Sequence, residues 1–242
     1  MEEALELEKY LPLSFKTRSE QDYIRFLWEA FESNYENNKC QFAFLAYHML
    51  TMSFIYFNIW QIKQTEPLDF AKAMVGFNKD LEKELVGATS PFTFWRVNES
   101  SVMRFLKLIG CDNGKVGKYA ALVKERNDTA HSNGNIFFST QAALDAKIRD
   151  ILRAVDEIQT HSIPVIQRCY ARFLHESNNP DDREYSDDID QIREILIHGH
   201  YLSRKDIGIC AAFDILDEFN IHANFPRIES LHQSVKIYYE NE

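Results

Sequence analysis

The chain has 242 residues, enough for one large domain or one domain with an appendage, and its 45% hydrophobic content is ordinary for a globular core. A net charge of −10 argues against a general nucleic-acid coat and against attachment to anionic lipid by charge. The cysteines Cys40, Cys111, Cys169 and Cys210 form no close pair, so they indicate neither a zinc site nor a disulfide framework. Together with an acidic N-terminus that lacks a secretion pattern, they predict a cytoplasmic protein.

Helical periodicity marks most of the chain, and few segments alternate with the period of two that a strand needs. Ser19 begins a segment that resembles a capping box in front of an apolar stripe, and Asn37 lies in a turn. Pro67 begins a helix that Gly87 stops, and Gly110 ends a shorter helix. The helices predicted here lie between Ser19 and Asn37, and over residues 40–62, 67–86 and 99–109.

The segment from Cys40 to Ile62 contains no charged residue and is long enough to cross a bilayer, so a membrane span has to be considered. Polar side chains are scattered through it, lysines flank both ends alike, and no second span follows. A central helix buried on most sides has the same pattern, and we expect this alternative, with no membrane partner. His48 on this helix is then a core histidine with a satisfied side chain rather than a ligand.

The second half of the chain begins with a predicted turn at 112–114 and a helix that leads to residue 131. Next come a long helix through 144–173 with a kink at Pro164, and an acidic, turn-rich segment that suits a linker or an exposed loop. Shorter helices are expected over 189–197, 205–219 and 228–239, the second behind a capping box at Ser203 to Asp206.

These elements predict an all-α fold. We expect a bundle of long antiparallel helices over residues 1–176, an acidic linker or loop over 177–188, and a smaller C-terminal helical extension over 189–242. In that extension His198 and His200 suggest a metal site, but alternate residues on a helix face opposite ways and no third ligand is near. The prediction is therefore no metal and no cofactor.

One predicted amphipathic helix has polar residues at the end of its apolar face. Its apolar stripe runs through Val116, Tyr119, Ala120 and Val123, and one turn further the same face would carry Asn127, Ala130 and His131. An amide and an imidazole on a buried face are costly unless they find partners. The stretch from Arg126 to His131 is therefore the candidate site.

The spacing of this stretch has two consequences. Asn127 and His131 lie four residues apart and are neighbours on a helix, so the amide could orient the imidazole. Arg126 and His131 are five apart, about 140° around a helix, so they converge only if the helix breaks near His131 or if a second molecule supplies one of them. Ser132-Asn133-Gly134-Asn135 is such a break.

Arg126 is followed by a polar residue and, after four intervening residues, by His131, which resembles the Arg-x4-6-His motif of the HEPN superfamily. By the order of the predicted helices, the resemblance extends over residues 19–175. The resemblance implies a helical protein that pairs as a homodimer and cleaves RNA without a metal, the Arg and His of both subunits lining one pocket. Arg126 and His131 would be the catalytic pair, with Asn127 as their polar neighbour. The alternative is a purely structural role, in which His131 and Asn127 only cap a helix end and Arg126 is a surface residue.

Charge is unevenly distributed. From Arg104 to Arg126 the chain holds six cations and two acids, a net charge of +4, whereas the rest carries −14. Such a stretch beside a candidate site could capture a phosphate chain, with Lys115, Lys118 and Lys124 as the substrate-binding residues, although a solvated helix face explains the same charges.

Three functions remain open from the sequence. The first is a metal-independent endoribonuclease, a toxin or antiphage defence effector that cuts RNA by attack of its own 2′-hydroxyl. The second is a catalytically silent HEPN-like adaptor module that binds RNA or a nucleotide, for example as the partner of a nucleotidyltransferase. A protein of the first kind could have an antitoxin as its partner. The third is a structural helical protein.

Overall fold

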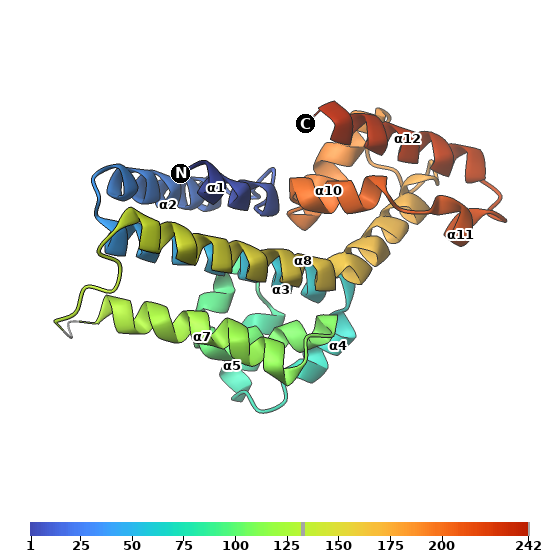
Figure 1. Cartoon of the computed structure of the whole chain (residues 1–242). Helices are drawn as coiled ribbons and strands as arrows, with labels where there is room; N and C mark the ends of the chain where they lie inside the picture. Colours follow the sequence, from blue (N-terminus) through green and yellow to red (C-terminus); the bar gives the residue numbers. More distant parts are fainter. Residues whose placement is uncertain (132–133, 242) are drawn as a thin grey trace. The chain divides into compact units, whose positions relative to one another are not determined.

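The structure is a computed structural model that describes residues 1–131 and 134–241 (Figure 1). Its regular elements in this part of the chain are all helical, and the β pairing there is limited to an isolated bridge between Pro12 and Ser203, which confirms the predicted all-α fold. The elements, in which η marks 3-10 helices except for the π-helix η4, are α1 Glu2–Leu5, η1 Glu6–Tyr10, α2 Arg18–Glu36, α3 Cys40–Thr65, α4 Pro67–Ala73, α5 Lys79–Val86, η2 Pro91–Arg96, α6 Glu99–Val102, η3 Met103–Ile109, α7 Asn113–Ala130, α8 Gln141–Ser177, α9 Asp188–Asp190, η4 Gln191–His198, α10 Arg204–Ala211, α11 Ile215–Phe219 and α12 Phe225–Asn241.

The chain forms two compact units. Unit 1 comprises Met1–Glu8 and Thr17–His161, and unit 2 comprises Lys9–Lys16 and Ser162–Glu242. The division lies within α8 and not at the acidic segment 177–188, which belongs wholly to unit 2.

Unit 1 is a bundle of long helices, in which α2 and α7 both pack on α3. Its capping box lies two residues before the predicted one: Thr17 Oγ1 accepts from the N–H of Glu20, whose carboxylate accepts from the N–H of Thr17, both at 3.2 Å. Thr17 has an extended backbone, as an N-cap requires, whereas Ser19 already lies inside the helix.

The central helix α3 is buried on nearly all sides, and every residue from Leu50 to Ile62 is buried. It is long and apolar enough to cross a membrane, but 83% of its most apolar window lies buried inside the structure. This burial favours the core-helix interpretation of the segment. His48 is 2% exposed and lies beside a carboxylate, as expected of a satisfied core histidine.

Some of the predicted elements of unit 1 differ in the structure. The helix predicted over 67–86 is broken into α4 and α5, because Gly76 has φ +100°, a conformation that L side chains rarely adopt, and Asn78 starts a new helix by accepting from the N–H of Leu81. The predicted turn at 112–114 is also wrong: Asp112 is the N-cap of α7, and its carboxylate accepts from the N–H of Lys115 at 2.9 Å.

Unit 2 has its own hydrophobic core, in which the second half of α8 packs with η4, α10, α11 and α12. Pro164 lies within α8, as predicted, and the capping box between Ser203 and Asp206 is present. The helix predicted over 205–219 is interrupted by Asp214, whose carboxylate caps α11. A buried hydrogen bond of 2.7 Å joins the Tyr170 hydroxyl to Nδ1 of His232.

Two histidines should make the stability of unit 2 depend on pH. Burial lowers the pKa of His200 to about 4, helped by Lys16 and Arg172, and burial together with Lys236 lowers the pKa of His232 to about 4. Between pH 6.5 and 4 the unfolded chain therefore binds more protons than the folded one, and the free energy of unfolding falls as pH falls through this window. Each histidine contributes up to about 3 kcal/mol of the loss.

Thermal unfolding followed at pH 7.5, 6, 5 and 4 checks this expectation. In the His200→Leu variant the unfolding temperature should depend less on pH than in wild type, because the variant lacks an imidazole that binds a proton on unfolding. Nδ1 of His200 is buried without a hydrogen-bond partner among the described residues, so the substitution removes no hydrogen bond of this atom. An equally steep profile in the variant would show that His200 does not titrate with unfolding.

Candidate functional site

The helix that carries the predicted motif ends close to where the sequence indicates. α7 stops at Ala130, and His131 follows with an extended backbone, φ −81° and ψ 146°. The N–H of His131 still donates to the carbonyl of Asn127 at 3.1 Å. The helix therefore breaks at His131, which is one of the two conditions under which Arg126 and His131 could approach each other.

The buried face of α7 continues differently from the prediction. Val116, Tyr119 and Val123 are buried as expected, but Thr129 is the buried residue of the last turn, and His131 is exposed. Arg126 lies seven residues after Tyr119, close to two full turns, and so shares the buried face. The expectation that His131 lies on this face is wrong, and Arg126 is no simple surface residue.

Arg126 belongs to a charged cluster, which we call the Glu99 cluster, made by Arg126, Glu99 of α6 and His48 of α3. The guanidinium of Arg126 forms an ion pair with Oε2 of Glu99, and the same oxygen lies 3.2 Å from Nε2 of His48. The side chains of Glu99 and Arg126 are 25% and 26% exposed. Because both neighbours approach Oε2, the second oxygen, Oε1, has no hydrogen-bond donor among the described residues.

The cluster keeps its carboxylate ionised. Burial by itself would raise the pKa of Glu99, but the hydrogen bonds and charges of His48 and Arg126 together lower this pKa to about 2. Nε of Arg126 is buried without a partner in the described part of the chain, so the guanidinium is only partly satisfied by Glu99. A fixed negative charge therefore lies beside an arginine that still has a free donor.

Glu99 also lies at the wall of an open pocket of about 500 Å³ between α2, α3 and η2, which we call the aromatic groove. It is lined among others by Tyr23, Met49, Tyr56, Phe92, Trp95 and Glu99. The indole of Trp95 is 64% exposed at this pocket, whereas Tyr56 is only 7% exposed. The groove thus combines a large aromatic surface with one carboxylate.

Two tyrosine hydroxyls of the groove lie near that carboxylate. Burial and the charge of Glu99 raise the pKa of Tyr56 and the pKa of Tyr23, so both phenols stay protonated. Neither hydroxyl has a hydrogen-bond partner within residues 1–131 and 134–241.

His131 and Asn127 take no part in the Glu99 cluster. Apart from the backbone bond between them, the described residues provide no hydrogen bond from the Asn127 side chain to His131, and no hydrogen bond of either side chain to the Arg126 guanidinium. The predicted orientation of the imidazole by Asn127 is therefore absent from the single chain. His131 instead presents its side chain to solvent at the end of α7.

The three predicted substrate-binding lysines differ in their surroundings. Lys118 and Lys115 lie 3.1 and 3.4 Å from the carboxylate of Glu157, and Lys115 also lies 2.6 Å from Nε2 of His161. Lys124 is exposed and has no ion-pair partner in the part of the chain that the structure describes. The same holds for Arg104 and Lys107 of the basic stretch. The uncompensated cations are therefore Lys124, Arg104 and Lys107.

If the basic stretch captures RNA, Lys124 should matter more than Lys118. We expect Lys124→Ala to weaken RNA binding several-fold and to reduce the slope of log affinity against log salt by about one, as loss of one phosphate contact requires. Lys118→Ala is the matched control and should change little, because Glu157 already compensates its charge. Equal effects of both variants, measured by fluorescence anisotropy at three salt concentrations, would contradict this assignment.

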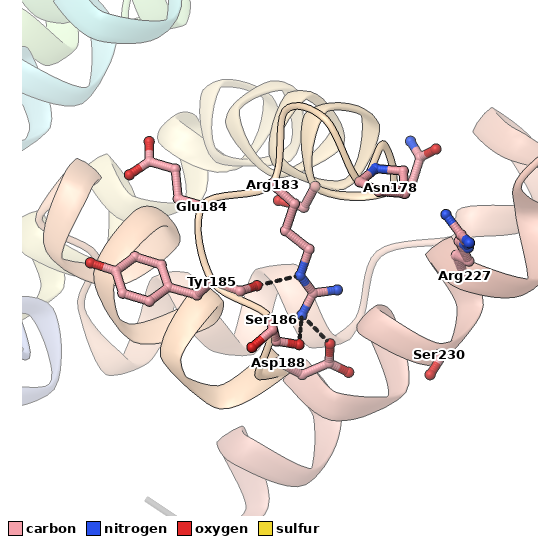
Figure 2. Close-up of a pocket in the computed structure, with 10 residues that line it drawn as sticks. Asn178, Arg183, Glu184, Tyr185, Ser186, Asp188, Arg227 and Ser230 are labelled. Atoms are coloured by element: carbon pink, nitrogen blue, oxygen red, sulfur yellow. Dashed lines mark hydrogen bonds and ion pairs between the residues drawn. The ribbon is translucent and has the colours of Figure 1, made fainter.

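Unit 2 contains a second pocket, of about 560 Å³, between the acidic segment and α12 (Figure 2). Arg183 crosses it and is held by its own loop, donating to the carbonyls of Tyr185 and Ser186 and forming an ion pair of 2.6 Å with Asp188. The segment 177–188 is thus a loop tied together by an arginine, one of the two structures that the sequence left open. No cluster of three metal-ligand side chains occurs among the described residues, at His198 and His200 or elsewhere.

The sequence alone does not mark Glu99, Tyr23 and Tyr56 as residues of the site. Glu99 looks like an ordinary acid in the first turn of a short helix, and the two tyrosines fit an apolar face. The one available signal was His48, an imidazole in the middle of a helix without charged residues, for which a partner has to be found elsewhere in the chain.

Comparison of the chain with known protein families, with curated proteins and with solved structures finds no match.

Proposed function

We propose that the protein is a metal-independent endoribonuclease of the HEPN type that works as a homodimer. The observation that carries the proposal is the end of α7, where an exposed histidine leaves the helix one turn after an arginine fixed on the inner face. An imidazole at a helix end is accessible to a polymer substrate, and imidazole is the side chain most often used as a general acid or base.

RNA carries its own nucleophile, so the protein has to move protons and stabilise charge. One His131 takes the proton of the 2′-hydroxyl, which attacks the adjacent phosphate; the other His131 of the dimer gives a proton to the leaving 5′-oxygen. The products are a 2′,3′-cyclic phosphate and a free 5′-hydroxyl. Arg126, with donors beyond those bound to Glu99, neutralises the charge that develops on the phosphate.

The homodimer is proposed because Arg126 and His131 face different sides at the end of α7. In one chain Arg126 faces Glu99 while His131 is exposed at the helix end, but a twofold axis near His131 repeats both residues on one surface. In a twofold pair the +4 stretches of two chains face each other, so an RNA bound between them should offset their repulsion and help to hold the dimer. Two chains sharing one site should also share one substrate.

Incubation with a single-stranded RNA tests the proposal. Cleavage in the presence of a chelator, with 2′,3′-cyclic phosphate ends, is expected, and an excess of inactive His131→Ala protein should suppress wild type by forming mixed dimers. Full activity in a species that light scattering shows to be monomeric would contradict the composite site.

One observation favours the silent RNA- or nucleotide-binding module instead. The arginine of the motif is already paired with Glu99, as a binding or structural role would require. RNA binding without any cleavage by the wild-type dimer would decide for this second function. In either case we propose a cytoplasmic protein, and an antitoxin or nucleotidyltransferase encoded next to it would name the partner.

A further inference from the structure

The aromatic side chains of the groove in unit 1 have no role in the motif or in the proposed cleavage chemistry. The aromatic groove combines the exposed ring of Trp95 with the rings of Tyr23, Tyr56 and Phe92, and it is bounded by the carboxylate of Glu99. A volume of about 500 Å³ is within the range of pockets that take a small organic ligand. Aromatic side chains are the usual stacking platforms for unpaired bases.

The polar groups of the groove select the kind of base. Oε1 of Glu99 can accept two hydrogen bonds and has no donor among the described residues. The hydroxyl of Tyr56, whose side chain is more than nine-tenths buried, lines the same groove and likewise has no partner there. A ligand that brings two neighbouring N–H donors would satisfy both groups.

We propose that the aromatic groove binds a guanine base, so that the RNA cleaved in the proposed reaction contains an unpaired guanine; this inference rests on the proposed function. Guanine carries two adjacent donors on its Watson–Crick edge, N1–H and the 2-amino group. Oε1 of Glu99 accepts from one of them and the Tyr56 hydroxyl from the other. Glu99 thus links base recognition to the arginine that it positions.

The other bases fit this arrangement less well. Adenine and cytosine each present one amine beside a ring nitrogen that is an acceptor, and a carboxylate repels that lone pair. Uracil presents a single N–H between two carbonyl oxygens. A groove that offers two acceptors leaves at least one of them without a donor when it takes one of these bases, and this loss disfavours them relative to guanine.

The stacking ring is held in place from one side. The guanidinium of Arg96 lies over the ring of Trp95, with its carbon 4.7 Å from the ring centroid, and Nε of Arg96 donates to Glu84 at 2.8 Å. A ring fixed in this way loses little freedom when a base stacks on it. Trp95 should therefore contribute to the affinity for any base, and the polar groups to the choice among bases.

Titration calorimetry with ribonucleoside 5′-monophosphates tests the inference, because all of them carry the same phosphate and ribose. We expect GMP to bind at least 10-fold more tightly than AMP, CMP or UMP, and IMP, which lacks the 2-amino group, to bind several-fold more weakly than GMP. Trp95→Ala should weaken all of them, and Tyr56→Phe should reduce mainly the preference for GMP. Phe26→Ala, an aromatic residue that is 61% exposed on α2, is the control and should bind like wild type.

Equal binding of GMP and AMP, no saturable binding of GMP, or unchanged selectivity in a folded Tyr56→Phe variant would each overturn the inference. Binding is measured without turnover, so the two proposals fail separately. Selective binding of GMP by a protein that cuts no RNA would contradict only the proposed function. Cleavage without any preference for guanine, together with equal binding of GMP and AMP, would contradict only the guanine site.

Discussion

Replacing His131 with alanine should reduce RNA cleavage by about 1,000-fold, the range expected for loss of a general acid or base. The same change should leave the midpoint of thermal unfolding within about 1 °C of wild type, since an exposed side chain without side-chain partners among the described residues adds little stability. Cleavage rates from single-turnover kinetics and unfolding curves on the same preparations provide both measurements.

Ser139→Ala is the control for this experiment, because Ser139 is exposed on the connection that follows α7 and has no hydrogen-bond partner within the described ranges. It should cleave RNA like wild type. A His131→Ala protein with more than a tenth of the wild-type rate would remove the imidazole from the mechanism. A large drop in its stability would show that His131 only ends a helix.

Arg126 should behave differently, because it pairs with the partly buried carboxylate of Glu99 as well as occupying a proposed catalytic position. Arg126→Ala leaves the carboxylate of Glu99 with His48 as its remaining partner, so we expect a loss of about 2 kcal/mol in stability, or roughly 4–8 °C in unfolding temperature, together with loss of cleavage. Both effects follow from one guanidinium, and a single variant does not separate them.

A second substitution separates them. Glu99→Gln in the Arg126→Ala chain replaces the carboxylate, which has lost its guanidinium partner, by a neutral amide, and should restore most of the stability but none of the cleavage. The single Glu99→Gln variant is the reference for this cycle. Recovery of cleavage in the stable double variant would show that Arg126 serves only to compensate Glu99 and has no role at the phosphate.

The sequence predicts the long helices well, because their signals are local. The buried residues of α7 and α8 repeat at helical spacing, and the capping box of α10 lies at Ser203 as predicted. The sequence does not predict the break inside 67–86, because it depends on a positive φ at Gly76, and a single glycine in a helical pattern does not show whether it adopts one. Asn78 is an ordinary N-cap that a continuous apolar pattern conceals.

The sequence likewise predicts one part of the candidate site and not the other. The helix end at His131 was predictable from the asparagines and glycine that follow it, whose preferences are local. The Glu99 cluster was not, because His48, Glu99 and Arg126 come from three helices that only the packed bundle brings together. A buried imidazole can show that a partner exists but not which carboxylate supplies it.

Cleavage of a chimeric oligonucleotide tests the central claim most directly. The strand is RNA except for a single 2′-deoxy nucleotide on the 5′ side of the mapped cleavage site, and the reaction contains a chelator. Attack by the 2′-hydroxyl requires that the all-RNA strand is cut to a 2′,3′-cyclic phosphate and that the chimera is left intact at this position. Cleavage of the chimera at the same bond, or cleavage of the RNA only when a divalent metal is present, would contradict the account.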